Sequence, residues 1–294
     1  MLNVSDSEPL ASERTFLITG GNTGIGLATA TALARGGARV YIACRDPERG
    51  KAAVAAITEA SSHAGVALLP LDLSSLNSVR ACAEAFLVRD EPLHVLINNA
   101  GVAGARGQTA DGFEAHFGIN HLGHFALTML LLDRLKASGP GCRVVNVSSE
   151  SHYGAPGIDW PTLQQKTRTF TGTREYAVSK LCNVLFTQEL ARRLGGAGTG
   201  TDSDVTTYAL HPGVVASDIW RRIPQPFRAL YTRRMITPEQ GAVTSLYCST
   251  SPQAAGESGL FYDKCQSVPP NPVATPELGE LLWKQSTEWT GVGY

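Results

Sequence analysis

The sequence TFLITGGNTGIG at residues 15–26, followed by the Ala- and Leu-rich run 27–35, decides the fold. Its first five residues are typical of a buried strand, and the run after it has the pattern of a helix. Between them, Gly20 permits a tight turn, Gly24 lets the backbone approach a pyrophosphate, and Gly26 allows the helix to pack closely on the strand. The amino end of such a helix attracts phosphates. The stretch therefore predicts a dinucleotide-binding strand, turn and helix.

Short aliphatic runs and longer amphipathic runs continue to alternate along the chain, which is typical of a parallel sheet. Strands are expected at residues 15–19, 39–43, 66–71, 94–98, 143–148, 205–210 and 259–263. The Gly-rich segment 195–200 is interpreted as a loop inside the same domain. We predict one α/β domain over residues 14–294, after a polar tail at residues 1–13. Its core is expected to be a Rossmann-like, doubly wound parallel sheet of about seven strands with helices on both faces.

Composition and charge narrow the choice of partner. The 294 residues carry a formal net charge of −1 without a basic stripe, which argues against nucleic acid. No apolar run has the length of a membrane span, so no membrane anchor is expected. The six cysteines are scattered, without a CxxC pair or metal-ligand spacing, which favours a reducing, cytoplasmic compartment and no metal. A small-molecule substrate is the remaining expectation.

The end of the second predicted strand indicates which dinucleotide binds. NAD-binding proteins usually place an acidic residue there, against the ribose hydroxyls, but this chain has Cys44. Arg45 follows and can pair with a 2′-phosphate, since guanidinium matches phosphate geometry. Asp46 either neutralises Arg45 or caps the next helix. We therefore expect NADP(H) to be preferred over NAD(H).

Tyr176 and Lys180 lie four residues apart in a helical pattern, so they share one helical face. A free phenol loses its proton only near pH 10, and a neighbouring ammonium would lower that pKa. On its own the pair would be read as part of a solvated helix surface. However, the polar runs 98–101 and 146–149 each end a predicted strand, and carboxyl ends of parallel strands open on the same ligand crevice. These elements together predict an acid/base site.

The order of these motifs resembles the short-chain dehydrogenase/reductase family over residues 14–290. The matching motifs are TGGNTGIG (19–26), LDL (71–73), NNAG (98–101), the asparagine of GINH (118–121), NVSS (146–149), YAVSK (176–180) and PG (212–213). The runs ACRD (43–46), HLGHF (121–125), LCNVLF (181–186) and HPGVV (211–215) look most like the retinol-dehydrogenase branch. The resemblance implies hydride transfer between nicotinamide and a carbonyl or alcohol.

The resemblance also implies roles for single residues. Ser149 would polarise the carbonyl, Tyr176 would donate or accept the proton, Lys180 would lower the pKa of Tyr176 and hold the nicotinamide ribose, and Asn120 would support a water relay. Ser149 is preferred to Ser148 because the family uses the second serine of NVSS. Cofactor contacts are expected at Gly20, Asn22, Thr23, Gly24, Ile25, Gly26, Arg45, Asp72, Leu73, Asn99, Ala100, Gly101, Tyr176, Lys180, Pro212, Gly213, Val215 and Ser217.

We expect the stretch 160–174 and a flap at residues 219–235 to wall an apolar substrate pocket suited to a hydrophobic ketone or aldehyde. The aromatic residues there fit ordinary core or a homo-oligomer contact equally well. His116, His121, His124 and His152 are interpreted as packing or surface residues. Two alternatives stay open: a catalytically silent NADP(H) sensor or scaffold, which the intact Ser149, Tyr176 and Lys180 disfavour, and a nucleotide-sugar epimerase or dehydratase, which the glycine spacing disfavours.

Overall fold

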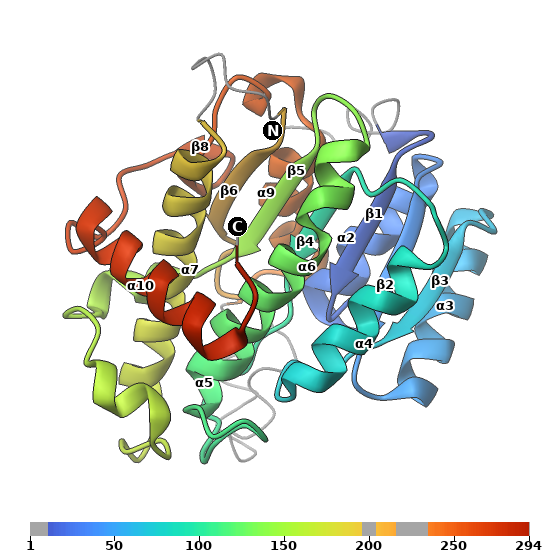
Figure 1. Ribbon diagram of the computed structural model, residues 1–294. Helices are drawn as coiled ribbons and strands as arrows, with labels where there is room; N and C mark the ends of the chain where they lie inside the picture. Colours follow the sequence, from blue (N-terminus) through green and yellow to red (C-terminus); the bar gives the residue numbers. More distant parts are fainter. Residues whose placement is uncertain (1–10, 196–203, 216–234, 294) are drawn as a thin grey trace.

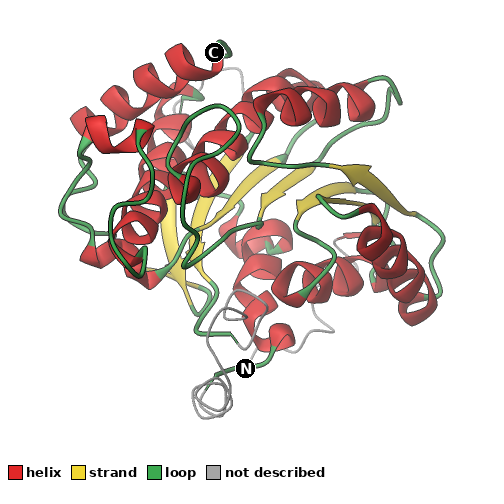
Figure 2. Ribbon diagram, turned by 90° about the horizontal axis from the view of Figure 1, so that it is seen from below, coloured by secondary structure: helices red, strands yellow, loops and turns green. Residues whose placement is uncertain are grey.

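The computed structural model describes residues 11–195, 204–215 and 235–293. They form one eight-stranded sheet in the order β3-β2-β1-β4-β5-β6-β7-β8, with helices on both faces (Figures 1 and 2). The strands are β1 (Thr15–Thr19), β2 (Arg39–Cys44), β3 (Val66–Pro70), β4 (Val95–Asn98), β5 (Arg143–Val147), β6 (Thr206–His211), β7 (Leu260–Asp263) and β8 (Gln266–Ser267). The predicted fold class is confirmed, and the seven predicted strands are parallel, with ends that differ by no more than one residue.

The helices cover the sheet in two layers (Figure 2). One layer holds α2 (Gly24–Arg35), α3 (Pro47–Ser61) and α9 (Pro238–Thr250), and the other holds α4 (Leu76–Leu87), α6 (Gly123–Ala137) and α7 (Thr173–Arg193), with α10 (Pro276–Thr290) against α7. Shorter helical turns are α5 (Ala115–Phe117), η2 (Gly118–Leu122), η3 (Glu150–Gly154), η4 (Trp160–Gln164) and η6 (Pro252–Ala254). β1 shows why both faces are covered: Leu17 packs into one core, and Phe16 and Ile18 pack into the other.

The order of the strands fixes where a ligand can bind. The chain runs outward from β1 through β2 to β3, then returns to β4 on the other side of β1 and continues outward. A crevice opens at the carboxyl ends of β1 and β4, where the direction reverses, and this is where open α/β sheets bind their ligands. The Gly-rich turn and the NNAG and NVSS motifs all follow strands at this edge.

β8 was not predicted. It pairs antiparallel with β7 through a two-residue turn at Lys264 and Cys265, whose φ values are 49° and 61°. Two consecutive positive φ angles define the turn that suits a tight hairpin. The sequence carries no Asn-Gly or Asp-Gly there, so the usual signal for this turn is missing.

Several expectations fall on residues outside the described ranges. These are most of the polar tail 1–13, most of the loop 195–200, Ser217, and the flap 219–235 except Met235.

In the stretch 160–174, the Phe170 side chain points outward, 85% exposed, with the Arg106 guanidinium 5.5 Å from its ring centroid. Neither Phe170 nor Trp160 lines the cofactor cleft described below. Within the described ranges, no helix is both long and apolar enough to cross a membrane.

Candidate cofactor-binding and active site

A cleft of about 310 Å³ lies at the carboxyl edge of the sheet. It brings together fifteen of the predicted residues: Gly20, Asn22, Thr23, Gly24, Ile25, Gly26, Arg45, Asp72, Leu73, Asn99, Ala100, Gly101, Tyr176, Lys180 and Pro212. These residues come from six separate stretches of the sequence. The cleft therefore has the lining expected of a site for an extended ligand that runs from β2 across β1 to α7.

The Gly-rich turn at one wall of the cleft is shaped for close approach. Gly20 and Gly24 have φ values of +68° and +54°, which glycine adopts without strain. A Cβ on Gly26 would lie 2.4 Å from the Gly20 carbonyl oxygen, so only glycine lets α2 begin this close to β1. The N-cap residue Thr23 makes no side-chain cap hydrogen bond, and the first turn of α2 holds no acidic residue. The helix start is thus compatible with a pyrophosphate, as the dinucleotide prediction requires.

The end of the cleft that is predicted to hold the adenosine is lined by Cys44, Arg45, Asp46 and Arg49. Asp46 Oδ1 accepts hydrogen bonds from the backbone amides of Glu48 and Arg49 at 3.0 and 3.1 Å, so it caps α3. This answers the question that the sequence left open. Burial raises the pKa of the Cys44 thiol, which keeps it uncharged where NAD-binding proteins carry a carboxylate. Sequence reasoning missed Arg49, although the cap at Asp46 places it in the first turn of α3.

Thr19 ties the Gly-rich turn to the NNAG turn. Its Oγ1 accepts the backbone N–H groups of Asn99 and Ala100, each at 3.0 Å, and lies 2.8 Å from His124 Nε2. Asn99 Nδ2 donates in return to the Thr19 carbonyl at 2.8 Å. His124 is buried and its burial lowers its pKa to about 4, so the ring is neutral and accepts the Thr19 proton. His124, interpreted from the sequence as a packing or surface residue, thus helps Thr19 to connect the Gly-rich turn and the NNAG turn, which form two walls of the cleft.

Asn98 and Asn146 do not reach the crevice. They pair across β4 and β5, with Asn98 Nδ2 donating to Asn146 Oδ1 at 2.8 Å, and each is 1% exposed. Asn146 Nδ2 donates in turn to Thr187 Oγ1 of α7 at 2.9 Å. The two asparagines form a buried polar connection beneath the cleft, and the residues after them line it.

Tyr176 and Lys180 come from one face of α7, as the spacing predicts. The Lys180 ammonium lies 5.7 Å from the centroid of the Tyr176 ring and donates to the Val147 carbonyl at 2.9 Å. Burial lowers the pKa of Lys180 to about 8. Burial also raises the pKa of Tyr176, and a hydrogen bond with Ser149 opposes that rise. The hydrogen bond from Ser149 therefore favours the phenolate of Tyr176.

The two serines of NVSS have different surroundings. Ser148 Oγ donates to the Lys180 carbonyl at 2.7 Å and so fixes α7 to the end of β5. Ser149 Oγ bonds with Tyr176 and with Ser151, whose amide donates to it at 3.1 Å. A hydroxyl can rotate between such partners. Ser149 is the serine that bonds with Tyr176, whereas Ser148 is the one that lines the cleft.

Asn120 lies in the π-helical turn η2, a type of irregularity that often occurs at functional sites. Its side chain accepts from the Val102 amide at 2.8 Å and donates to Val102 O and Ser179 Oγ, at 3.1 and 3.0 Å. Its backbone carbonyl accepts from His124 Nδ1 at 3.0 Å. The side chain of Asn120 therefore holds the wall of the cleft, and the water relay stays a prediction.

The remaining predicted contacts lie around the cleft. Asp72 Oδ1 accepts from the amide and hydroxyl of Ser74, so only part of its carboxylate is free for adenine. Gly213 has a φ of +87° and follows Pro212 at the end of β6. The Val215 side chain is buried, and a Cβ on Gly241 would lie 2.5 Å from it, so a contact to the nicotinamide would have to come from its backbone.

The chain belongs to the short-chain dehydrogenase family. The family model described as short chain dehydrogenase matches residues 14–161. The family binds nicotinamide cofactors, and the Gly-rich turn and cleft agree with that.

Within the family, the chain belongs to the retinol-dehydrogenase-like branch. It is 46% identical to human retinol dehydrogenase 12 over 283 residues, which cover 95% of this chain and 87% of that protein. It is 40% identical to human polyprenol dehydrogenase over 295 residues, covering 97% and 87%. A solved structure of an uncharacterised protein from Mycobacterium paratuberculosis superposes with a TM-score of 0.79 at 33% identity, covering 100% of this chain and 98% of that one.

Proposed function

We propose that this dehydrogenase is NADP(H)-dependent and interconverts a hydrophobic ketone or aldehyde with its alcohol, with Tyr176 as general acid and base. One observation carries the proposal: Tyr176 and Lys180 line one end of a cleft whose other end starts at the Gly-rich turn, and Ser149 is hydrogen-bonded with Tyr176. Bound NADPH would supply the hydride. Ser149 would donate a hydrogen bond to the carbonyl oxygen, and Tyr176 would give that oxygen its proton.

Lys180 prepares the site for this proton transfer. Its ammonium lies beside Gly101, where an added Cβ would be 3.5 Å from Nζ, and so borders the space available to the nicotinamide ribose. With a pKa of about 8, it is mostly charged at neutral pH. A positive charge here stabilises the tyrosinate that remains after the proton has left.

The preference for NADP(H) is supported by three residues at the adenosine end. Arg45 and Arg49 are exposed at the cleft, and the neutral Cys44 thiol offers no anion to repel a 2′-phosphate. The substrate class is supported by the names of relatives, which act on retinol and polyprenol, both apolar alcohols. We further propose one catalytic domain over residues 14–294 and a cytoplasmic location, which five buried free cysteines suit.

The test is NADPH oxidation followed at 340 nm against a panel of hydrophobic carbonyls that includes retinal and polyprenal. The proposal expects turnover with at least one member and loss of that turnover in Tyr176→Phe. Tight binding of NADPH without turnover, and with no effect of Tyr176→Phe, would favour a silent sensor instead.

A further inference from the structure

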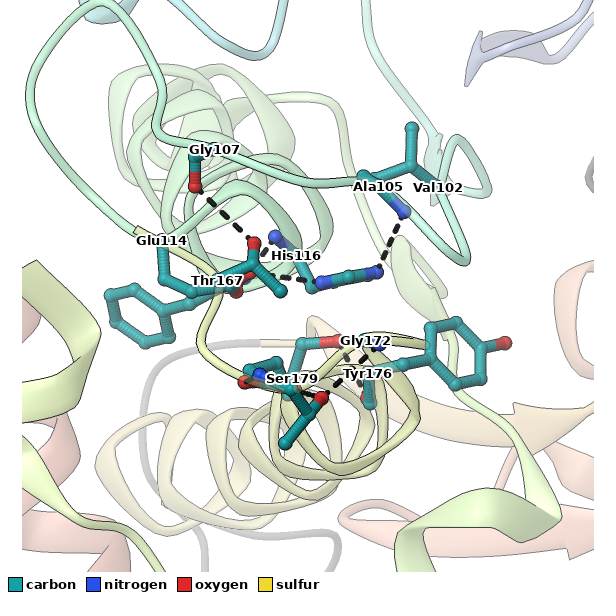
Figure 3. Close-up of polar contacts among 12 residues, drawn as sticks. Val102, Ala105, Gly107, Glu114, His116, Thr167, Gly172, Tyr176 and Ser179 are labelled. Carbon is teal, nitrogen blue, oxygen red and sulfur yellow. Dashed lines mark hydrogen bonds and ion pairs between the residues drawn. The ribbon is translucent and has the colours of Figure 1, made fainter. Parts of the chain in front are cut away.

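A buried carboxylate lies just outside the cleft and is completely engaged. Glu114 is 3% exposed and caps α5, with Oε2 accepting from the amides of His116 and Phe117 at 2.8 and 2.9 Å. Its Oε1 accepts from Thr167 Oγ1 at 2.5 Å and lies 2.9 Å from His116 Nδ1 (Figure 3). Two backbone amides and one hydroxyl donate to this buried carboxylate. Glu114 therefore acts as an acceptor toward the imidazole.

That arrangement decides the tautomer of His116. Because the backbone N–H of Ala105 can only donate, Nε2 carries the lone pair, and the imidazole proton is on Nδ1, which faces Glu114. Nε2 lies 3.1 Å from the backbone nitrogen of Ala105 and accepts its N–H (Figure 3). The ring is fully buried. His116 is thus held at both ring nitrogens, by the Glu114 carboxylate at Nδ1 and by the Ala105 N–H at Nε2.

Ala105 belongs to the segment 101–105, which follows the NNAG motif and lines the cofactor cleft. Gly101, Val102, Ala103 and Ala105 all border the cleft. Asn120 binds both the N–H and the C=O of Val102. Two side chains therefore hold this segment: Asn120 binds it near its start, at Val102, and His116 binds it at its end, at Ala105. Asn120 and His116 lie four residues apart in one continuous helical stretch.

The other side of the His116 ring faces the helix that carries the tyrosine. The His116 and Tyr176 rings meet edge to face, with centroids 6.1 Å apart and planes at 74°. Gly172, whose carbonyl accepts the Tyr176 N–H at 2.9 Å, packs on the same imidazole: an added Cβ would lie 2.6 Å from Cε1. One side chain thus contacts both segment 101–105, which lines the cofactor cleft, and the first turn of α7.

We propose that His116, oriented by Glu114, is a positioning residue that sets the distance between segment 101–105 and the Tyr176 ring. This rests on the proposed function. The hydrogen bond from Ala105 to Nε2 carries the effect, and the contact with Glu114 fixes the ring for it. Removing the Nε2 acceptor while keeping the Glu114 contact should loosen segment 101–105 and misplace the phenol of Tyr176.

Two amide substitutions separate these contacts. In His116→Asn, the amide nitrogen can take the place of Nδ1 and keep Glu114 satisfied, but the side chain is too short for Ala105. In His116→Gln, the amide oxygen reaches the place of Nε2 and can accept the Ala105 N–H. We expect His116→Asn to weaken NADPH binding and to lower kcat, each about three- to tenfold, the range for one lost hydrogen bond. We expect His116→Gln to recover both values to within about twofold.

The matched control is His121→Asn, the same change at a fully buried histidine whose Nε2 bonds with Ser286 of α10, away from the cleft. It should lower Tm and leave the NADPH Kd and the kcat per folded molecule unchanged. NADPH affinity is measured by fluorescence titration, which needs no turnover. If wild-type protein does not bind NADPH, the proposed function is wrong. If it does, and His116→Asn equals wild type or His116→Gln loses as much as His116→Asn, only the role of His116 is overturned.

Should His116→Asn fail to fold, amide hydrogen exchange in the wild-type protein tests the same bond. The Ala105 amide should be protected, because Nε2 accepts it in a buried setting. Exchange at the rate of an unstructured amide would overturn the proposal.

Discussion

Lys180→Met should stabilise the cofactor-free protein at neutral pH while it removes a group that the cleft needs. The Lys180 side chain is 3% exposed, and burial lowers its pKa from 10.5 to about 8. At roughly 1.4 kcal/mol per pH unit, keeping this amine charged in the folded state costs about 3 kcal/mol below pH 8. The unfolded chain holds the proton more tightly, so this cost fades as the pH rises from 8 to 10.5.

The substitution also removes one favourable contact, the hydrogen bond from Nζ to the Val147 carbonyl, worth about 1 kcal/mol. That carbonyl keeps a second donor, Asn183 Nδ2 at 3.3 Å, so it is not left unpaired. The net expectation at pH 7 is a gain of about 2 kcal/mol in the free energy of unfolding, or roughly 3 °C in Tm. At pH 10 the gain should have largely disappeared.

The assay is urea unfolding of wild type and Lys180→Met at pH 7 and pH 10, without cofactor. Lys284→Met, at an exposed lysine of α10, serves as the control and should show no such dependence on pH. NADPH affinity should fall in Lys180→Met at the same time. A variant that is less stable than wild type by the same amount at both pH values would refute the argument that burial of the charge is costly here.

Three further predictions concern the cofactor and the proton. Arg45→Ala should weaken NADPH binding about tenfold to hundredfold and leave NADH nearly unchanged in fluorescence titrations, with Arg49→Ala acting in the same direction; equal losses for both cofactors would remove Arg45 from the 2′-phosphate. Ser149→Ala should lower kcat roughly hundredfold, as loss of a donor to a developing oxyanion does, and by far more than Ser148→Ala. The rate of alcohol oxidation should rise with pH, because oxidation needs the deprotonated Tyr176 and burial raises the pKa of that phenol. The rate of carbonyl reduction should stay flat to about pH 8, the pKa of Lys180. Oxidation that slows with rising pH would speak against Tyr176 as the base.

Local rules in the sequence were enough to predict much of the fold and most of the residues that line the cleft. The turn itself requires Gly20, Gly24 and Gly26, and the helix requires the four-residue spacing of Tyr176 and Lys180. Both features can therefore be predicted from residues that are close together in the chain. The carboxyl ends of parallel strands then bring these motifs to one edge of the sheet.

Contacts between distant segments could not be predicted in the same way. Asn98 and Asn99 are adjacent asparagines of one motif, yet the pairing of β4 with β5 buries Asn98 against Asn146, while Asn99 lines the cleft. The role of His116 depends on Ala105, eleven positions earlier, and on the first turn of α7. Such contacts require the packed structure, because no local periodicity encodes them.

The central claim is that Tyr176 transfers the proton, and Tyr176→Phe tests it most directly on a confirmed carbonyl substrate. The change keeps the ring and its packing against His116 but removes the hydroxyl. We expect kcat to fall by roughly a hundredfold to ten-thousandfold, the range for loss of acid/base catalysis, while NADPH affinity changes little. Full activity of Tyr176→Phe would contradict the account.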